Sequence, residues 1–152
     1  MQDNNIVHKM VSECMTPSPI TVDRYKTVFE ANELMKLKKI RRLPVLDDDK
    51  LVGIVSWSDI LEARPTTIKS GNTFREVDNI STKIIVDLVM SKNPLTIYQT
   101  DTIGHAAEMM LENKIGGLPV LDGSHKLVGV ITESDIFRQI VTRWREDNMR
   151  MA

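Results

Sequence analysis

The chain has 152 residues and a mass of 17.3 kDa, with 41% hydrophobic and 27% charged residues. This composition is typical of a globular protein and argues against wholesale disorder. Twenty basic and twenty-one acidic residues leave a net charge of −1, which excludes a globally basic nucleic-acid binder. The single cysteine, Cys14, excludes an intramolecular disulfide framework and any multi-cysteine zinc site.

No stretch approaches the roughly 18 consecutive apolar residues of a membrane-spanning helix, and the N-terminus has no signal-peptide pattern. The sequence therefore predicts a soluble, cytoplasmic protein whose partners include neither a membrane nor a nucleic acid. The three histidines, His8, His105 and His125, lie far apart, and no nucleophile has an evident base beside it. We therefore expect no catalytic residue, no metal site and no enzyme activity.

The chain contains an internal duplication. Residues 15–49 align with 90–124 at fourteen identical positions of thirty-five, and residues 50–61 align with 126–137 at seven of twelve. Each copy has about sixty residues, too few to bury a comfortable core alone. We expect the two copies to pack sheet against sheet with pseudo-twofold symmetry, which would create clefts between them.

Both copies predict the element order β-α-β-β-α, a mixed α/β (α+β) fold. The first copy contains a short strand at 20–22, a helix at 27–38, a hairpin of 43–46 with 51–55, and a helix beginning near Ser56. The second contains a strand at 95–97, a helix at 102–113, a hairpin of 118–121 with 127–131, and a helix beginning near Thr132. Thr100 or Asp101 is expected to cap the helix at 102–113, whereas the helix at 27–38 has no equally good capping residue.

The duplication divides the chain into five parts. These are an N-terminal extension (1–10), a first repeat (11–64), a polar connector (65–85), a second repeat with a C-terminal helix (86–145) and a tail (146–152). A turn at 70–72 and a partial helix around 74–80 are expected in the connector. The C-terminal helix, expected at 134–145, places apolar side chains on one face, which predicts core packing or contact with a second protomer; they are Ile136, Phe137, Ile140, Val141 and Trp144.

One motif, G-h-h-[ST]-x-x-D, occurs in each copy, at residues 53–59 and 129–135. On one interpretation Ser56 and Thr132 cap the helix that follows, and Asp59 and Asp135 complete a capping box. On the other, the hydroxyl binds an anion and the carboxylate accepts hydrogen bonds from two ribose hydroxyls. Capping boxes prefer Glu or Gln at the last position, yet both copies have Asp. The residues alone leave both interpretations open.

The repeat I-x-x-L-P-V-L-D followed by K-L-V-G-h-h-[ST]-x-S-D-I resembles the cystathionine-β-synthase (CBS) domain, and the tandem resembles a stand-alone CBS pair. The resemblance covers residues from about 10 to 140. It implies a non-enzymatic regulatory module that requires no cofactor. The regulatory ligand that it implies is AMP, ADP or ATP, less often NAD(H) or S-adenosylmethionine, bound in clefts between the repeats. It assigns the ribose to Asp59 and Asp135 and the phosphate to Ser56 and Thr132. The residues that it implies along the adenine slots are Ile20, Thr21, Leu43, Pro44, Leu95, Thr96, Leu118 and Pro119.

The copies differ in charge before the Leu-Pro pair. Arg41 and Arg42 in the first copy correspond to Gly116 and Gly117 in the second. In CBS pairs, basic residues at this place typically reach phosphates bound in the partner repeat's cleft, and arginine can hold phosphate through two hydrogen bonds. We therefore predict that the Thr132/Asp135 cleft, facing the arginines, prefers a phosphorylated nucleotide. The Ser56/Asp59 cleft, facing Gly117, should take a less charged adenosyl ligand or bind weakly.

Two functions remain open. The first is a non-enzymatic module that senses an adenosine-containing nucleotide and acts on an effector protein that the sequence does not identify. The second is a dimerisation or protein-interaction module, a homodimer in which the two motifs serve only as helix caps.

Overall fold

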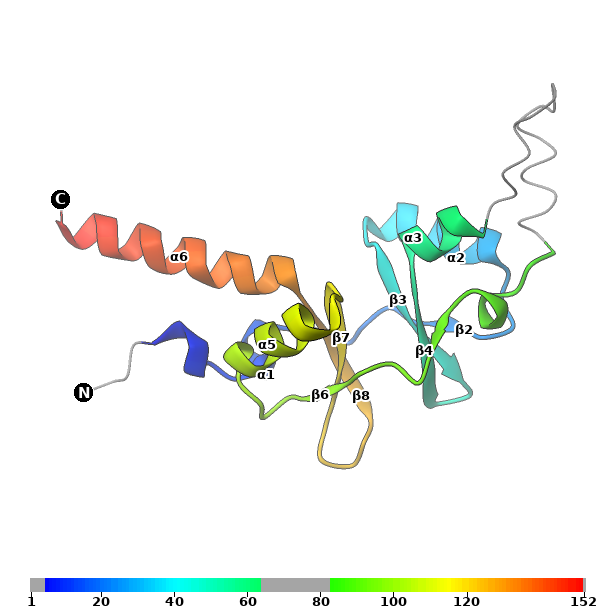
Figure 1. The fold of residues 1–152 in the computed structure, drawn as a ribbon, viewed down its shortest axis with the longest axis horizontal. Coiled ribbons are helices and arrows are strands. Elements are labelled where there is room, and N and C mark those ends of the chain that lie inside the picture. The colour runs from blue at the N-terminus through cyan, green and yellow to red at the C-terminus, as the bar shows by residue number, and fades with distance from the viewer. Residues whose placement is uncertain (1–4, 64–82, 152) are drawn as a thin grey trace, which may run out of the picture. The chain divides into compact units, whose positions relative to one another are not determined.

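A computed structural model describes residues 5–63 and 83–151 (Figure 1). The chain forms two compact units, each with one four-stranded sheet. Unit 1 consists of Met1–Pro19 together with Leu95–Ala152, and unit 2 of Ile20–Pro94. The predicted mixed α/β class is confirmed. The turn at 70–72 and the helix around 74–80 lie outside the described residues.

Unit 2 contains the strands and helices of the first repeat. They are β2 (Val22–Asp23), α2 (Val28–Lys38), β3 (Arg42–Asp47), β4 (Lys50–Ser56) and α3 (Trp57–Glu62), followed by η2 (Val86–Leu88) and β5 (Ser91–Lys92). The sheet order is β2-β3-β4-β5, with β2 parallel to β3 and the other pairs antiparallel. The β-α-β-β-α order expected for this repeat is confirmed.

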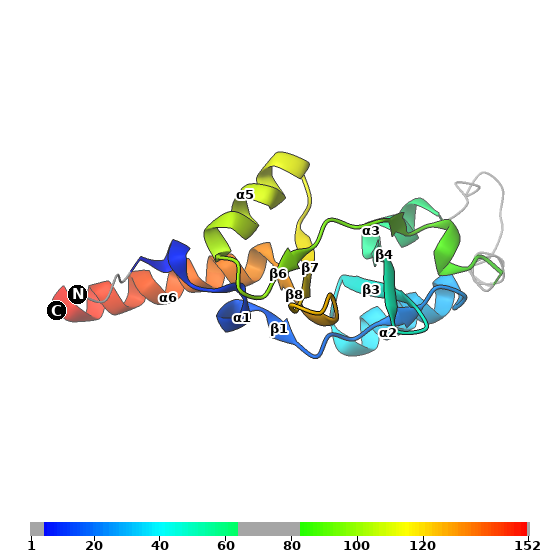
Figure 2. The same cartoon turned by 90° about the horizontal axis from the view of Figure 1, so that it is seen from below.

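Unit 1 has the same topology, as Figures 1 and 2 show. Its elements are η1 (Ile6–His8), α1 (Val11–Cys14), β1 (Thr16–Pro17), β6 (Ile97–Tyr98), α5 (Ile103–Asn113), β7 (Gly117–Leu121), β8 (Leu127–Thr132) and α6 (Glu133–Met151). The sheet order is β1-β8-β7-β6, with β6 parallel to β7 and the other pairs antiparallel.

The compact units are divided differently from the sequence repeats, because the repeats exchange their first segments. The strand β1 opens the first repeat but pairs with β8 of the second, Thr16 opposite Val130. Conversely, β5 opens the second repeat but pairs with β4 of the first, Ser91 opposite Ile54. Each sheet therefore has an edge strand supplied by the other repeat. The residues expected as an N-terminal extension belong to this arrangement, since Ile103 N donates to Lys9 O at 2.9 Å.

The exchanged strands pass directly over the motif glycines. A Cβ atom added to Gly129 would lie 2.9 Å from the Thr16 carbonyl oxygen and would also collide with the Met15 sulfur. Likewise, within unit 2, a Cβ atom on Gly53 would lie 2.9 Å from the Ser91 carbonyl oxygen. Because a backbone oxygen cannot move aside like a flexible side chain, both positions require the absence of a side chain.

Each unit buries its own hydrophobic core. In unit 2 the sheet contributes Leu43, Val45 and Val55, against which α2 packs Met35 and α3 packs Ile60. The equivalent core of unit 1 contains Leu118, Val120 and Ile131 from the sheet, with Ala106 and Met110 from α5 and Val11 from the exchanged segment. Residues two apart on a strand point to one face, so Leu43 and Val45 face the helices, and Arg42 and Pro44 face the other way.

The helix caps differ from expectation at two positions. The prediction that the first long helix lacks a good cap is wrong, because Thr27 caps α2: its Oγ1 accepts from Glu30 N, and Glu30 Oε2 accepts from Thr27 N at 2.8 Å. The hydrogen bond from the Thr27 amide, followed by that from Lys26, lowers the pKa of the Glu30 carboxyl group. In the other unit Thr102, rather than Thr100 or Asp101, caps α5 by accepting from His105 N.

An ion-pair network in unit 2 joins the exchanged segment to the sheet. The Arg24 guanidinium donates to Asp47 at the end of β3 and to Asp87 in η2, both at 2.7 Å. These hydrogen bonds raise the pKa of Arg24, that to Asp47 first. The equivalent residue of unit 1 is the uncharged Gln99. It makes the same backbone hydrogen bond to the exchanged segment as Arg24, accepting from Ser12 N where Arg24 accepts from Asp87 N. Charge therefore reinforces the exchange in unit 2, whereas the backbone bonds are common to both units.

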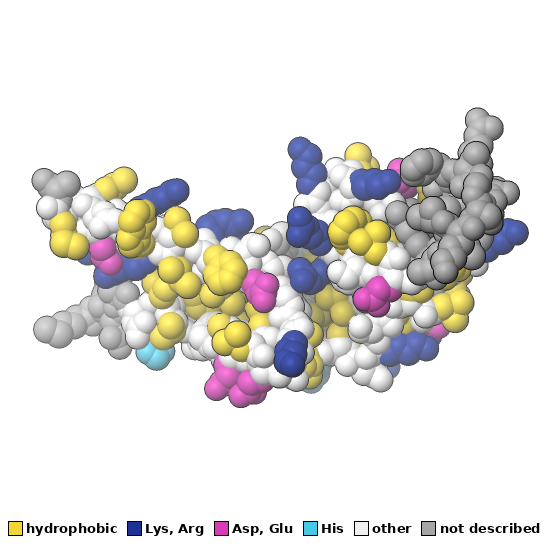
Figure 3. Space-filling model, turned by 45° about the horizontal axis from the view of Figure 1, so that its top comes forward, with side chains coloured by type: hydrophobic (Ala, Val, Ile, Leu, Met, Phe, Trp, Pro, Cys, Tyr) yellow, Lys and Arg dark blue, Asp and Glu magenta, His cyan; other side chains and the backbone are white. Residues whose placement is uncertain are grey.

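The C-terminal helix is longer than expected and its apolar face points outward. α6 continues to Met151, so the tail expected from 146 is helical through that residue. Of the five apolar residues predicted on one face, only Ile136 packs against the core. The other four, Phe137, Ile140, Val141 and Trp144, are exposed, and Figure 3 shows hydrophobic side chains gathered along this helix. No described helix is long and apolar enough to cross a membrane.

We expect Gly129→Ala to lower the free energy of unfolding by roughly 1–3 kcal/mol, because the new methyl group must displace the backbone of β1. Gly53→Ala should have a similar effect through β5. The matched control is Gly123→Ala, since a Cβ atom there meets nothing within 4 Å. Urea unfolding followed by circular dichroism measures all three. Equal stability of the Gly123 and Gly129 variants would contradict the proposed role of the close approach.

Candidate functional site

In unit 2 the motif joins β4 to α3. Ser56 N donates to Asp59 Oδ2 at 2.7 Å, and Asp59 N donates to Ser56 Oγ at 3.1 Å. The two residues thus form a reciprocal capping box. Trp57 N, at the start of the helix, donates to the Arg41 carbonyl oxygen at 2.8 Å. The capping interpretation of the motif is confirmed for this unit.

In unit 1 the motif joins β8 to α6, with a different set of hydrogen bonds. Asp135 Oδ2 accepts from Thr132 N at 2.9 Å and from Thr132 Oγ1 at 3.0 Å. Its other oxygen, Oδ1, accepts from the Arg138 guanidinium at 3.1 Å. Asp135 is only 7% exposed, whereas Asp59 is half-buried. Asp135 is therefore held by more donors than Asp59 and is less open to solvent.

The residues before each Leu-Pro pair lie beside the motif of their own unit. Arg42 is paired with Ser56 in the β3–β4 register, and Gly117 is paired with Thr132 in the β7–β8 register. Paired residues of antiparallel strands place their side chains on the same face. The Arg42 side chain therefore starts next to Ser56. That Arg41 and Arg42 also serve the other motif's cleft stays a prediction.

The residues expected along the adenine slots fall into two groups. Leu43 and Leu118 are fully buried in the cores, so they can contribute to a ligand site only through their backbone; Gly117, Pro44 and Pro119 are also buried. The second group, Ile20, Thr21, Leu95 and Thr96, is exposed or half-buried. Because Val22 pairs with Val45 in parallel, Ile20 and Thr21 approach the end of the sheet that carries Arg42 and Ser56. Ile97 pairs in the same way with Val120, so Leu95 and Thr96 approach the end of the sheet that carries Gly117 and Thr132.

The family of the chain follows from comparison with known proteins. The model of the CBS domain matches residues 11–66 and 85–142. The chain belongs to the CBS domain family. A CBS domain-containing protein of Dictyostelium discoideum is 30% identical over 133 residues, which cover 87% of this chain and 91% of that protein.

Solved CBS pairs share the fold. The crystal structure of CBSX2 in complex with AMP has a TM-score of 0.71 and 31% identity, and the match covers 88% of this chain and 96% of that one. The CBS domain pair of protein MJ0100, in complex with 5′-methylthioadenosine and S-adenosyl-L-methionine, has a TM-score of 0.73 and 26% identity, covering 89% and 98%.

Other CBS relatives are longer proteins. The chain spans 38% of the length of an uncharacterized protein of Methanocaldococcus jannaschii and 21% of a homoserine O-acetyltransferase of Methanosarcina acetivorans.

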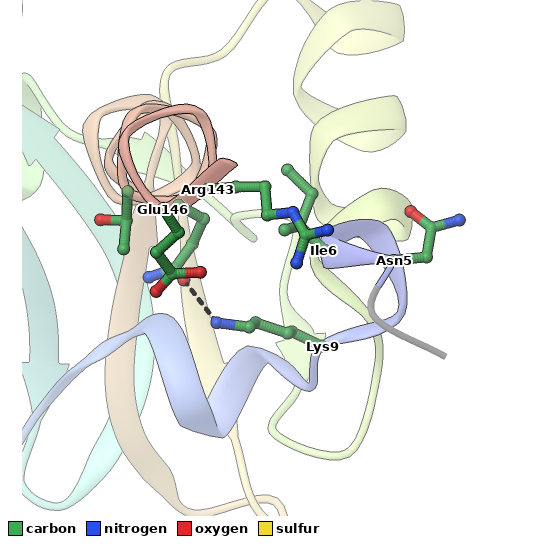
Figure 4. A pocket seen from close by; sticks show the side chains of 7 residues that line it. Asn5, Ile6, Lys9, Arg143 and Glu146 are labelled. Carbon is green, nitrogen blue, oxygen red and sulfur yellow. Dashed lines mark hydrogen bonds between the residues drawn. The ribbon is translucent and has the colours of Figure 1, made fainter. Parts of the chain in front are cut away.

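Beyond the CBS motifs, unit 1 contains a small polar pocket of about 80 Å³. Figure 4 shows Lys9 and Arg143 pointing into it from the N-terminal segment and from α6. Lys9 Nζ donates to Gln139 at 3.0 Å, and Arg143 donates to Asp147 at 3.0 Å. Both cations thus already have partners, and none of the predicted ligand residues lines the pocket.

Within residues 5–63 and 83–151, no group of three or more acidic, histidine or cysteine side chains is arranged to hold a metal ion. Cys14 is buried, and burial raises the pKa of its thiol, which disfavours the reactive thiolate.

Sequence reasoning missed one residue at the motif of unit 1. Arg138 contacts Asp135 from the next turn of α6, and the corresponding residue of the first repeat is Glu62. The signal was present in the sequence: an Asp and an Arg three residues apart on a helix lie close enough to pair. The alignment of the two repeats, which matches Ser134-Asp135-Ile136 with Ser58-Asp59-Ile60, would have shown the charge reversal.

We expect Asp59→Ala to cost roughly 1 kcal/mol of stability, because the Ser56 amide loses its side-chain acceptor at the helix start. Asp59→Asn should cost much less, since its amide oxygen can still accept from that N–H. Thermal unfolding of both variants beside the wild type measures the difference. If the Ala variant is as stable as the Asn variant, the capping box contributes nothing measurable.

Proposed function

We propose that this chain is a non-enzymatic regulatory module that binds adenosine-containing ligands, AMP, ADP or ATP first among them. The observation that carries the proposal is the duplicated carboxylate, Asp59 in one unit and Asp135 in the other, held next to a strand end at equivalent positions. The crystal structures of two similar CBS pairs contain AMP, 5′-methylthioadenosine or S-adenosyl-L-methionine, which supports an adenosine-containing ligand in general.

The proposed roles follow the chemistry of the side chains. The carboxylates of Asp59 and Asp135 accept hydrogen bonds from the vicinal ribose hydroxyls. The hydroxyls of Ser56 and Thr132 bind phosphate, and the guanidinium groups of Arg41 and Arg42 neutralise it. The adenine lies against the segments around Ile20–Thr21 and Leu95–Thr96 and the backbone of the Leu-Pro pairs. In this proposal the nucleotide is a regulatory ligand, and no separate cofactor is required.

Calorimetric titration with AMP and ATP tests this proposal on Asp59→Asn and Asp135→Asn. The Asn variants are chosen because they retain the helix cap, so that lost binding is not lost folding. The charge difference between the repeats predicts that Asp135→Asn loses most of the nucleotide affinity, at least tenfold, while Asp59→Asn retains it. GTP serves as the non-adenine control.

The opposite ranking of the two variants would reverse the assignment of the sites. Unchanged affinity in both variants, or no binding of any adenosyl compound at millimolar concentration, would contradict the proposed function.

The second candidate function is dimerisation, and α6 favours it. At 3.6 residues per turn, Gln139, Arg143 and Glu146 lie on the face that lines the polar pocket against the N-terminal segment. Phe137, Ile140, Val141 and Trp144 lie on the opposite face and are exposed. The polar face of this helix packs inward and its apolar face is exposed to water. Covering the apolar face with a second copy would remove apolar surface from water, which is favourable in free energy. The acidic first turn and basic last turn of α6 favour the antiparallel pairing of two copies.

We expect Trp144→Glu to convert a dimer to a monomer, because it places a charge on the apolar face that forms the proposed contact. Light scattering after size-exclusion chromatography measures the mass. Met149→Glu is the matched control: Met149 is also an exposed apolar residue of α6, but it lies off the stripe. A wild-type mass of one chain at micromolar concentration would rule out this interface.

A further inference from the structure

The two motif carboxylates differ in how many acceptor positions they have left. An ionised carboxylate offers about four lone-pair positions on its two oxygens. On Asp135, Thr132 uses both positions of Oδ2, and Arg138 uses one position of Oδ1. About one position is left. Two vicinal ribose hydroxyls, each donating one hydrogen bond, need two.

Asp59 has a different balance. Among the described residues, the donor to its carboxylate is Ser56 N, on Oδ2. Its partner in the capping box, Ser56 Oγ, accepts from Asp59 N instead of donating. The residue three positions on is Glu62, which repels a carboxylate where Arg138 attracts one. The Asp59 carboxylate thus keeps enough acceptor positions for both ribose hydroxyls.

We propose that Arg138 competes with the ribose for Asp135, so that the Thr132/Asp135 site binds an adenosine moiety only after the Arg138–Asp135 ion pair has opened. This inference rests on the proposed function, since it assumes that Asp135 binds ribose. It assigns to Arg138 a positioning role that acts through Asp135 and sets the relative affinities of the two sites.

The opening of the ion pair is feasible because Arg138 lies on the solvent side. Its side chain is 68% exposed, whereas that of Asp135 is 9% exposed. An exposed ion pair is weak and is screened by salt. The competition should therefore lower the affinity by about two- to five-fold rather than abolish binding, the range that follows from the free energy of exposed ion pairs.

Adenosine is the probe, because it has the ribose hydroxyls but no phosphate that Arg138 could bind. The titration uses the full chain with Asp59→Asn, which leaves the Thr132/Asp135 site to report. In that background we expect Arg138→Gln to raise the affinity for adenosine about two- to five-fold. Arg143→Gln is the matched control: it removes another ion pair of α6, that with Asp147, and should leave the affinity unchanged.

Two further readouts separate competition from a merely structural effect. Raising the salt concentration should increase the affinity of the Asp59→Asn chain for uncharged adenosine, and Arg138→Gln should remove that dependence. In the reciprocal chain with Asp135→Asn, Glu62→Arg should lower the affinity at Asp59 by a similar factor, whereas Glu62→Gln should not.

The outcomes are distinguishable. The inference is overturned if Arg138→Gln leaves adenosine binding unchanged or weaker and the Asp59→Asn chain with Arg138 intact shows no salt dependence. Arg138–Asp135 is then an ordinary helix ion pair, and the proposed function stands. No binding of adenosine, AMP or ATP by any of the wild-type, Asp59→Asn and Asp135→Asn chains overturns both the inference and the proposed function.

Discussion

The close approach of a backbone segment to the motif glycine is the constraint on which each unit depends. The Thr16 carbonyl over Gly129, and the Ser91 carbonyl over Gly53, leave no space for a side chain. Each approaching strand comes from the other sequence repeat. Neither repeat therefore completes its four-stranded sheet from its own residues. The G of G-h-h-[ST]-x-x-D is therefore a packing requirement.

The Ser and Asp of the motif cap the start of the helix, and the cap uses only part of the hydrogen-bonding capacity of the Asp carboxylate. Ser56 and Asp59 satisfy each other's amides, which needs one carboxylate oxygen. A Glu in place of Asp would serve the cap equally well. The hydrogen bond from Ser56 N uses only Oδ2 of Asp59, and Ser56 is paired with Arg42 in the neighbouring strand. Capping and ligand binding are thus compatible uses of one side chain, and the alternatives that the sequence left open do not exclude each other.

Local patterns predicted the elements well, because they depend on neighbours along the chain. The apolar runs before and after 47–50 and 122–126 predicted both hairpins, and the apolar stripe at 28–35 predicted α2. The Thr27–Glu30 capping box was readable in the same way but was overlooked. The exchange of first segments was not predictable, since the short runs around 16–17 and 91–92 do not encode which sheet they join. Nor could the amphipathic pattern of α6 tell which face points inward, because Lys9 and the N-terminal segment, far away in sequence, pack against its polar side.

The two repeats have diverged in charge around the motif, whereas their cores have changed only between apolar residues. Leu43 and Val45 of one core are repeated as Leu118 and Val120 of the other, and Val55 is replaced by the similar Ile131, because a large change of volume there is felt by every packed neighbour. Beside the carboxylates this constraint is absent: Arg42 of the first repeat corresponds to Gly117 of the second, and Glu62 corresponds to Arg138. Exposed charges can change at little cost in stability. The duplicated fold therefore keeps two equivalent backbone frameworks, while the charges around each motif differ. A difference in affinity between the two proposed sites is the expected physical consequence.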